Sequence, residues 1–432
     1  MADRSGYQRG GERALLLAGW FWASMAIADG VAFDIDDPPS PDHRLADNLN
    51  GGAKLVVESE YRDDHDLDRH RDDRRISLEP QLEAVLAWAP AADAGVVAEL
   101  ELRQKYWPDH PDGRRSDDAV LELKELYLWL REFAPGWSVQ LGRQRYRDRR
   151  EWLYDEELDG IRLLYRRDSW GLELSATREE AFDRDLFNSD DETPIDNYEL
   201  RLRQRLAEDR DLDLYWLRRD EREADGEDLD FVGIHSSGRA SSHHYYWLEA
   251  AVVSGERRGR DILGYGVDLG WSYRFSGAQR HNLTLGVAYG SGDNDGSGTD
   301  NNFRQTGLQD NNAKLQGVTK VKIYGELLEP ELSNLVIATL GWGMRTSEDS
   351  SIDLLYHRYR QVEADDDLRD SNLLDDPNGD SRDIGEAVDL VWAGRLAKDL
   401  KLSWALGTFK PGRAYDRRDR AWFSELSLNL RF

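Results

Sequence analysis

The sequence contains no cysteine among its 432 residues. A chain without cysteine cannot depend on disulfides, which excludes the small disulfide-stapled extracellular scaffolds. Beyond its amino-terminal stretch it also lacks any apolar run long enough for a membrane-spanning helix, which needs about 20 residues. The composition is polar and acidic, with a mean hydropathy of −0.73, 33% charged residues and a formal net charge of −28. These features are compatible with two or three soluble acidic domains, or with a membrane protein built from strands.

The stretch Met1 to Ala28 has the features of a secretory signal peptide. It contains three basic residues, an apolar core and a small-residue cleavage site, in that order: Arg4, Arg9 and Arg13; Ala14 to Ala23; and Ala26-Ile27-Ala28. The apolar core is too short for a transmembrane anchor. We therefore expect residues 1–28 to be removed and residues 29–432 to form a single domain.

No catalytic constellation is evident. The 9 histidines lack metal-ligand spacing, and His357, the one candidate within an expected strand, has no serine elbow motif beside it. Phosphate-binding loops and dinucleotide fingerprints are absent. The sequence therefore predicts neither an enzyme nor a cofactor. Binding of divalent cations by the acidic loops stays an open question. The stretch Asp293-Asn294-Asp295-Gly296 does not complete an EF-hand, because residue 304 is Arg.

Alternation of apolar and polar residues with a period of two predicts β-strands along the chain. The clearest stretch is 421–432, where Trp422 and Leu426 share one parity and Glu425 and Ser427 the other. We expect eighteen strands, near residues 51–61, 76–88, 95–107, 119–130, 137–146, 159–167, 170–177, 197–206, 211–218, 229–236, 243–253, 263–275, 281–290, 333–344, 351–361, 385–396, 400–409 and 421–432.

The connections between these strands alternate in length. Those after even-numbered strands are short, as in Asp168–Ser169 and Ala397–Asp399, whereas those after odd-numbered strands are long and charged, as in Ser291–Leu332 and Val362–Ile384. Short periplasmic turns alternating with long external loops are typical of even-stranded bacterial barrels. The sequence therefore predicts an all-β fold, a transmembrane antiparallel β-barrel of about eighteen strands, with its last strand paired to its first.

Several expected strands place basic residues opposite their apolar face. In Tyr198–Leu206 the leucines alternate with Arg201, Arg203 and Arg205, so lipid-facing leucines direct three arginines into the lumen. These arginines either attract carboxylates in the passage or pair with lumen glutamates within the wall. In 400–409 the inward residues include the small side chains Ser403 and Ala405, which predicts space for a pore.

Strand 137–146 does not fit the simple scheme. Val139 and Leu141 share their parity with Arg143 and Arg145, so no single face is apolar throughout. Either a bulge changes the register within the strand, or the arginines lie above the hydrocarbon zone.

Several motifs resemble those of the bacterial outer-membrane alginate export porin family. They are Gly142-Arg143-Gln144-Arg145, Tyr265-Gly266-Val267-Asp268-Leu269-Gly270, Phe303-Arg304-Gln305-Thr306-Gly307-Leu308, Glu331-Leu332-Ser333-Asn334-Leu335, and Phe409-Lys410-Pro411-Gly412 with Ala414-Tyr415. The likeness covers nearly the whole mature chain and is densest after residue 265. It implies an eighteen-stranded barrel that carries a polyuronate chain outward through an electropositive constriction, with no energy source in the barrel itself.

The resemblance also implies roles for individual residues. The basic pore positions of the family correspond to Lys54, Lys124, Arg143, Arg145 and Arg304, and the acidic partners that orient arginines correspond to Asp155 and Asp185. The sequence departs from the family at four positions: Glu79, Ser403 and Ala405 replace basic residues, and Ser427 replaces an aspartate. We therefore expect a less positive and wider constriction.

These observations predict an arginine- and lysine-lined, anion-selective channel of the bacterial outer membrane for passive export of alginate or a related polyuronate. Its expected partners are the polyuronate chain, outer-membrane lipid and lipopolysaccharide, the barrel assembly machinery and periplasmic polysaccharide-export proteins, without nucleic acid. The alternative is a general or anion-selective porin for uptake of small acidic sugars. A barrel enzyme or adhesin is disfavoured by the missing catalytic set. Segment 291–332 is a candidate gate that folds inward or over the mouth.

Overall fold

The computed structural model describes residues 41–432 except 183, 188–193, 223–225 and 295–297. The predicted signal peptide, residues 1–28, lies outside the described part of the chain. The described residues form strands joined by turns and loops. Within this part of the chain, no helix has the length and apolar character needed to cross a membrane.

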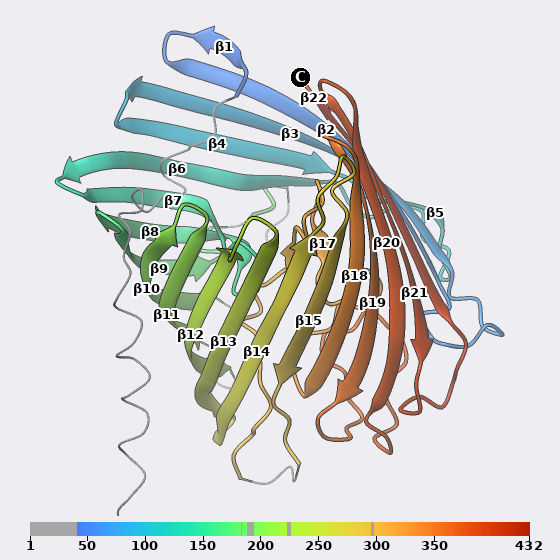
Figure 1. The fold of residues 1–432 in the computed structure, drawn as a ribbon. Helices are drawn as coiled ribbons and strands as arrows, with labels where there is room; N and C mark the ends of the chain where they lie inside the picture. The colour runs from blue at the N-terminus through green and yellow to red at the C-terminus, as the bar shows by residue number, and fades with distance from the viewer. Residues whose placement is uncertain (1–40, 183, 188–193, 223–225, 295–297) are drawn as a thin grey trace, which may run out of the picture.

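The strands form one antiparallel sheet that closes on itself (Figure 1). The sheet has 20 strands, of which β1 (His43–Ala46) and β5 (Tyr106–Asp109) are short additions, so 18 strands make the barrel. It closes between its first and last strands, where Leu55 lies opposite Leu430. Every barrel strand therefore has a partner on both sides, which leaves no edge unpaired. The predicted fold class is confirmed.

The barrel strands, in chain order, are β2 (Leu49–Asp63), β3 (Arg75–Ala91), β4 (Ala94–Arg103), β6 (Val120–Ala134), β7 (Trp137–Arg147), β8 (Asp155–Arg167), β9 (Trp170–Glu179), β10 (Ile195–Ala207), β11 (Arg210–Glu221), β12 (Glu227–Arg239), β13 (His244–Arg257), β14 (Arg260–Arg274), β15 (Asn282–Gly290), β18 (Leu335–Ser347), β19 (Ser350–Gln361), β20 (Asp383–Ala397), β21 (Leu400–Pro411) and β22 (Ala421–Arg431). Each of the eighteen predicted strands corresponds to one of them.

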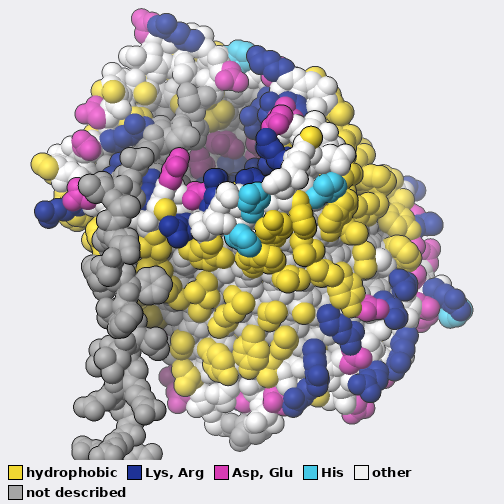
Figure 2. Space-filling view, viewed as in Figure 1, with side chains coloured by type: hydrophobic (Ala, Val, Ile, Leu, Met, Phe, Trp, Pro, Cys, Tyr) yellow, Lys and Arg dark blue, Asp and Glu magenta, His cyan; other side chains and the backbone are white. Residues whose placement is uncertain are grey.

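Apolar and polar side chains alternate between the two faces of the barrel wall. On β15, Leu285 and Val287 are 47% and 46% exposed on the outer face, whereas Thr284 and Ala288 on the inner face are buried. Figure 2 shows the resulting band of hydrophobic side chains across the outside of the barrel. A continuous apolar band of this kind is unfavourable in water and suits contact with lipid acyl chains. Figure 2 also shows a hollow at the upper end of the molecule, lined by basic and acidic side chains.

The connections largely follow the predicted alternation. The short-turn end, which we take as periplasmic, carries turns such as the one between β8 and β9, and the long-loop end carries segments such as 362–382. One junction departs from the pattern: β13 and β14 meet at the long-loop end through only Arg258 and Gly259. A second difference lies in predicted strand 95–107, where β4 ends at Arg103 and the following β5 pairs with β3 instead.

The irregular strand β7 leaves the wall near Gly142. The φ of Gly142 is 126°, a left-handed value, and a Cβ there would lie 2.2 Å from the carbonyl oxygen of Leu126, so only glycine fits. Beyond Arg143, β7 no longer pairs with β6; instead Leu123 of β6 donates its N–H to the carbonyl of Arg184. The register of β7 with β8 continues unbroken to Arg147 and Asp155, so the bulge proposed as the first of the two explanations is not observed; instead the end of β7 separates from β6 and turns into the lumen.

We call the connection between β15 and β18 the inner segment; the structure describes its residues 291–294 and 298–334, and the part from Phe303 onward packs inside the barrel. The segment leaves β15 at the long-loop end and contains the short pair β16 (Asn312–Ala313) and β17 (Val321–Lys322). Its middle part reaches the short-turn end, where Arg345 donates hydrogen bonds to the carbonyls of Gln316 and Gly317, and Val318 donates its N–H to Ser351 Oγ at 2.9 Å. Of the two predicted positions of this segment, inside the barrel or over its mouth, the structure shows the first, and its role as a gate stays a prediction.

The inner segment also corrects the expectation that small residues on β21 leave open space. A Cβ on Gly407 would lie 3.2 Å from Leu327 Cβ, and Leu327 is fully buried. Ala405 packs against the same apolar cluster inside the barrel. The space beside these small side chains is therefore filled by the inner segment.

Candidate pore-lining site

Two elements meet inside the barrel: the inner segment and the β7–β8 connection, residues 148–154, which we call the inner loop. Leu308 accepts a hydrogen bond from the N–H of Asp155 at 2.7 Å, and the carbonyl of Glu151 accepts from Asn311 at 2.8 Å. The Trp152 and Phe303 rings stack with centroids 5.9 Å apart. These contacts join the two elements into one packed unit that narrows the lumen.

Asp148 determines the conformation of the inner loop. Its Oδ1 accepts hydrogen bonds from the N–H groups of Arg150 and Trp152, and its Oδ2 accepts from those of Leu153 and Tyr154, at distances of 2.7 to 3.2 Å. A carboxylate that accepts four backbone donors fixes a tight turn that would otherwise leave those donors unpaired. The Asp148 carboxylate therefore stabilises the loop by accepting hydrogen bonds from the loop's own backbone N–H groups.

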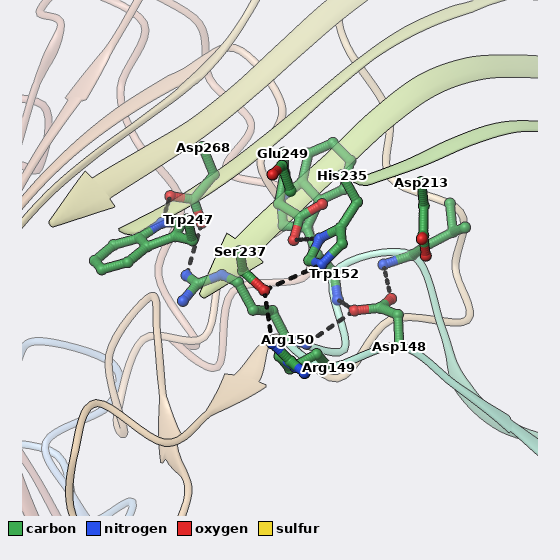
Figure 3. A network of polar contacts seen from close by, with 12 residues as sticks. Asp148, Arg149, Arg150, Trp152, Asp213, His235, Ser237, Trp247, Glu249 and Asp268 are labelled. Carbon is green, nitrogen blue, oxygen red and sulfur yellow. Dashed lines mark hydrogen bonds and ion pairs between the residues drawn. The ribbon is translucent and has the colours of Figure 1, made fainter. Parts of the chain in front are cut away.

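The inner loop and the inner segment are anchored to the wall by a polar network (Figure 3). Arg150 approaches Asp268 of β14 at 3.0 Å, and its guanidinium lies 4.3 Å from the centroid of the Trp247 ring. Trp247 donates to the same carboxylate at 2.7 Å, and the Tyr324 hydroxyl donates to it at 3.2 Å. Asp268 is therefore a shared acceptor for the wall, the loop and the segment.

Arg143 and Arg145 both lie on the inward end of β7, but in different surroundings. Arg143 is 3% exposed and makes a bidentate pair with Asp159 at 2.8 and 2.6 Å. Arg145 makes a bidentate pair with Asp155 at 2.6 and 2.7 Å, while its side chain stays 43% exposed. The Arg145–Asp155 pair brings together two of the predicted site residues. Arg143 is enclosed, whereas Arg145 faces the water of the lumen.

Lys54 and Lys124 are held by glutamates. Lys54 on β2 contacts both oxygens of Glu83 at 2.6 and 2.7 Å. Lys124 lies 3.3 Å from Glu157 and 3.6 Å from Glu122, at a point where β6 skips one residue in its pairing with β4. Both lysines are partly exposed, so each presents a neutralised pair, not an isolated positive charge, to the lumen.

Arg304 and Asp185 lie away from the Arg145 group. Arg304 is 5% exposed and pairs with Asp300 at 2.5 Å and with Glu227 of β12, which ties the inner segment to the wall. Asp185 accepts hydrogen bonds from the N–H groups of Leu121 and Phe187, in the stretch that runs beside β6. The structure therefore disperses the predicted residues over several parts of the lumen.

Arg201 and Arg203 belong to a dense ionic network in the wall. Arg201 is 4% exposed and lies 2.9 Å from Glu199, and Arg203 lies 2.9 Å from Asp213. Arg162 and Glu173 of the neighbouring strands make a further buried pair. Of the two alternatives for these arginines, pairing with lumen carboxylates is the one observed. Their role is to join strands β8 to β11 across the inner face.

Three lumen cations were not among the predicted site residues. Arg147 and Lys314 are exposed, and within the described residues neither has a carboxylate at ion-pair distance. Lys320 lies on the inner segment and pairs with Glu151 of the inner loop. Arg147 could have been found from the sequence, because it continues the spacing of Arg143 and Arg145 just past the end of the predicted strand 137–146. Lys314 and Lys320 could not, because their position depends on how the inner segment folds.

Among the described residues, two groups of carboxylates have oxygens within reach of a shared ion: Asp63 with Asp64 and Asp73, and Glu151 with Asp155 and Asp310. Glu151, Asp155 and Asp310 lie close enough for their oxygens to share an ion, but each is paired with a cation: Lys320, Arg145 and Lys322. Asp293 of the predicted calcium loop pairs with Arg260 at 2.5 Å, and Asp295 and Gly296 lie outside the described residues. Calcium binding in that loop stays a prediction.

The fold and the charged lumen define the class of this protein: an outer-membrane β-barrel channel. The family model described as alginate export matches residues 47–427. The chain belongs to the alginate export family.

Individual relatives agree with this assignment. The chain is 28% identical to the alginate production protein AlgE of Pseudomonas aeruginosa over 222 residues, which are 43% of this chain and 44% of that protein. It is 30% identical to AlgE of Azotobacter vinelandii over 178 residues, 36% of each chain. The aligned parts thus span less than half of each relative.

Solved porin structures share the fold. The structure of Pseudomonas aeruginosa OccK11 (OpdR) matches with a TM-score of 0.60 and 14% identity, over 91% of this chain and 98% of that one. Acinetobacter baumannii OccAB3 matches with a TM-score of 0.56 and 12% identity, over 88% and 99%. At such low identity these matches concern the fold alone.

Proposed function

We propose that this protein passively conducts alginate, or a closely related polyuronate, outward through its lumen. Membership in the alginate export family supports the substrate class. The observation that carries the proposal is the row of exposed arginines Arg145, Arg147 and Arg149 beside the inner loop, in a chain whose net charge is −28; Arg145 and Arg149 have carboxylate partners in Asp155 and Asp211, and Arg147 has none among the described residues. A general negative surface therefore surrounds a local positive path.

Carboxylates repeated along a polymer suit such a path. Each uronate residue carries one carboxylate, and a cation in a partly dehydrated passage attracts it more strongly than the same cation in bulk water. Several weak contacts in series draw a chain in without trapping any one residue, as conduction requires. The barrel itself needs no energy source for this process, and the channel function involves no catalysis.

The wall that adjoins β7 through β6 favours a second candidate function, a porin for small acidic sugars. Lys54 on β2 faces Glu83, and Lys105 in the connection after β4 faces Glu79, so this wall adds no net positive charge. A lumen that is positive on one side only would bind a long polyanion less tightly than a fully basic ring.

Release from proteoliposomes distinguishes the two functions. Purified protein is reconstituted into vesicles loaded with labelled oligoguluronates of increasing length and with neutral oligosaccharides of matched length. The proposal predicts faster release of the uronates, with the advantage kept or increased as the oligomers lengthen. Release that favours only mono- and disaccharides, or that ignores charge, would contradict polyuronate conduction.

A further inference from the structure

A pocket of about 450 Å³ lies between the inner loop, the inner segment and the wall. The wall contributes the ends of β12, β13 and β14 that carry the short turns, through residues such as Gly238, Tyr245 and Ser272. The volume falls within the range of small-ligand sites and is large enough for one or two sugar residues. This pocket is not lined by the cations that match basic pore positions of the family, which are Lys54, Lys124, Arg143, Arg145 and Arg304.

The lining of this pocket is positive. It contains five basic side chains, two of which belong to the inner segment, Arg147, Arg149, Arg150, Lys314 and Lys320, against the two acidic side chains Asp148 and Glu151. Asp148 accepts four backbone hydrogen bonds, and Glu151 is fully buried against Lys320. Lys320 is paired with Glu151, Arg149 with Asp211 and Arg150 with Asp268, so the positive charge that stays unpaired at the cavity is that of Arg147 and Lys314.

Arg147 and Lys314 have the character of ligand-binding groups. Both side chains are exposed, and among the described residues neither has a carboxylate partner. They differ in this from the lumen cations Lys54, Lys124 and Arg145, each of which is paired with a carboxylate. One of the two unpaired charges comes from β7 and the other from the inner segment. Two unpaired cations across one small cavity are unfavourable without an anion between them.

The electrostatics at Lys320 agree with this. Burial, and next the neighbouring Arg147 and Arg145, lower the pKa of Lys320 to about 8 although Glu151 lies against it. Burial is the larger cause of this shift, and the part that comes from Arg147 and Arg145 reflects a positive local potential. The same potential attracts a carboxylate from solution.

We propose that Arg147 and Lys314 form a carboxylate subsite that binds one uronate residue of the passing chain, and that this subsite exists only while the inner segment is inserted. The inner segment is then part of the conducting path and not simply an obstruction. This inference rests on the proposed function, since it assumes that a polyuronate enters the lumen.

Calorimetric titration of the full-length protein in detergent with triguluronate tests the subsite. We expect Arg147→Gln and Lys314→Gln each to weaken binding about five- to tenfold, as loss of a charge-assisted contact in a confined site does. Lys398→Gln, which removes an exposed positive charge from the turn between β20 and β21, is the matched control and should bind like the wild type. Far-UV circular dichroism and heat-dependent gel migration verify that each variant keeps the barrel.

The possible outcomes separate the two proposals. Wild-type binding that is unchanged in both Arg147→Gln and Lys314→Gln would overturn the subsite and leave polyuronate conduction standing. A wild type that does not bind triguluronate at all would overturn both. Equal weakening by Lys398→Gln would also contradict the subsite, because it would reduce the effect to overall charge.

Discussion

Arg143 and Arg145 lie two residues apart on the same strand, yet their different surroundings give them different roles. Arg143 is enclosed, with Asp159 and two backbone carbonyls as acceptors, those of Leu123 and Phe182. Arg145 keeps a water-facing guanidinium beside Asp155. Loss of one partner from a buried pair leaves the other charge uncompensated, whereas an exposed pair contributes little to stability.

This difference predicts unequal losses of stability. Arg143→Ala should lower the free energy of unfolding by about 3 kcal/mol or more, because Asp159 stays buried without its cation. Arg145→Ala should lower it by less, about 1–2 kcal/mol, because the Arg145 guanidinium is 43% exposed and water screens its pair with the buried Asp155 carboxylate. Denaturant unfolding in detergent, followed by tryptophan fluorescence, measures both. Equal losses in the two variants would show that the assignment of a structural role to Arg143 is wrong.

At the scale of elements, the wall could be predicted from the sequence and the interior could not. Strands such as 281–290 carry their signal locally, because each residue's face follows from its parity. The contacts of the inner segment join distant positions, such as Thr306 to Leu153, which are 153 positions apart in the chain. The same limit explains why the small residue Ala405 on β21 was interpreted as lining open space, and why Lys314 was missed. Arg143 and Arg145 were found only through a family motif.

The inner segment should respond to pH through its buried carboxyl groups. Burial, with Asp389 nearby, raises the pKa of Glu326 to about 8, and burial raises the pKa of Glu331 to about 7 although Arg369 lies beside it. Both groups hold protons more tightly when the segment is inserted than they would in water. The stabilisation of the inserted state is therefore complete at low pH and is lost as pH rises through these values.

Single-channel conductance should accordingly rise between about pH 5.5 and about pH 8, as ionised Glu326 and Glu331 favour withdrawal of the segment. The double variant Glu326→Gln and Glu331→Gln keeps the shape of the protonated groups and should give a flat profile over this range. Above about pH 8, Lys320 loses its proton more readily when the segment is inserted, which favours the inserted state and opposes the rise in conductance. The range below about pH 8 therefore tests the prediction. A wild-type profile that is flat or falls with pH would contradict the prediction.

At the scale of the whole molecule, a strongly acidic chain presents a row of exposed arginines to the interior of its barrel. The chain carries 85 acidic against 57 basic residues. The inner loop and the end of β7 nevertheless place Arg145, Arg147 and Arg149 toward the water of the lumen. Because a confined passage focuses the field of its own lining, these few side chains determine selectivity more than the distant surface does.

The most direct test of the account is single-channel recording of the purified protein in a planar bilayer, with oligouronate titrated into one chamber. The account predicts an anion-selective current that oligouronates block reversibly, with the block weakened in Arg145→Ala and restored in Arg145→Lys. A cation-selective current that ignores oligouronates, as the net charge of the chain alone would produce, would contradict it.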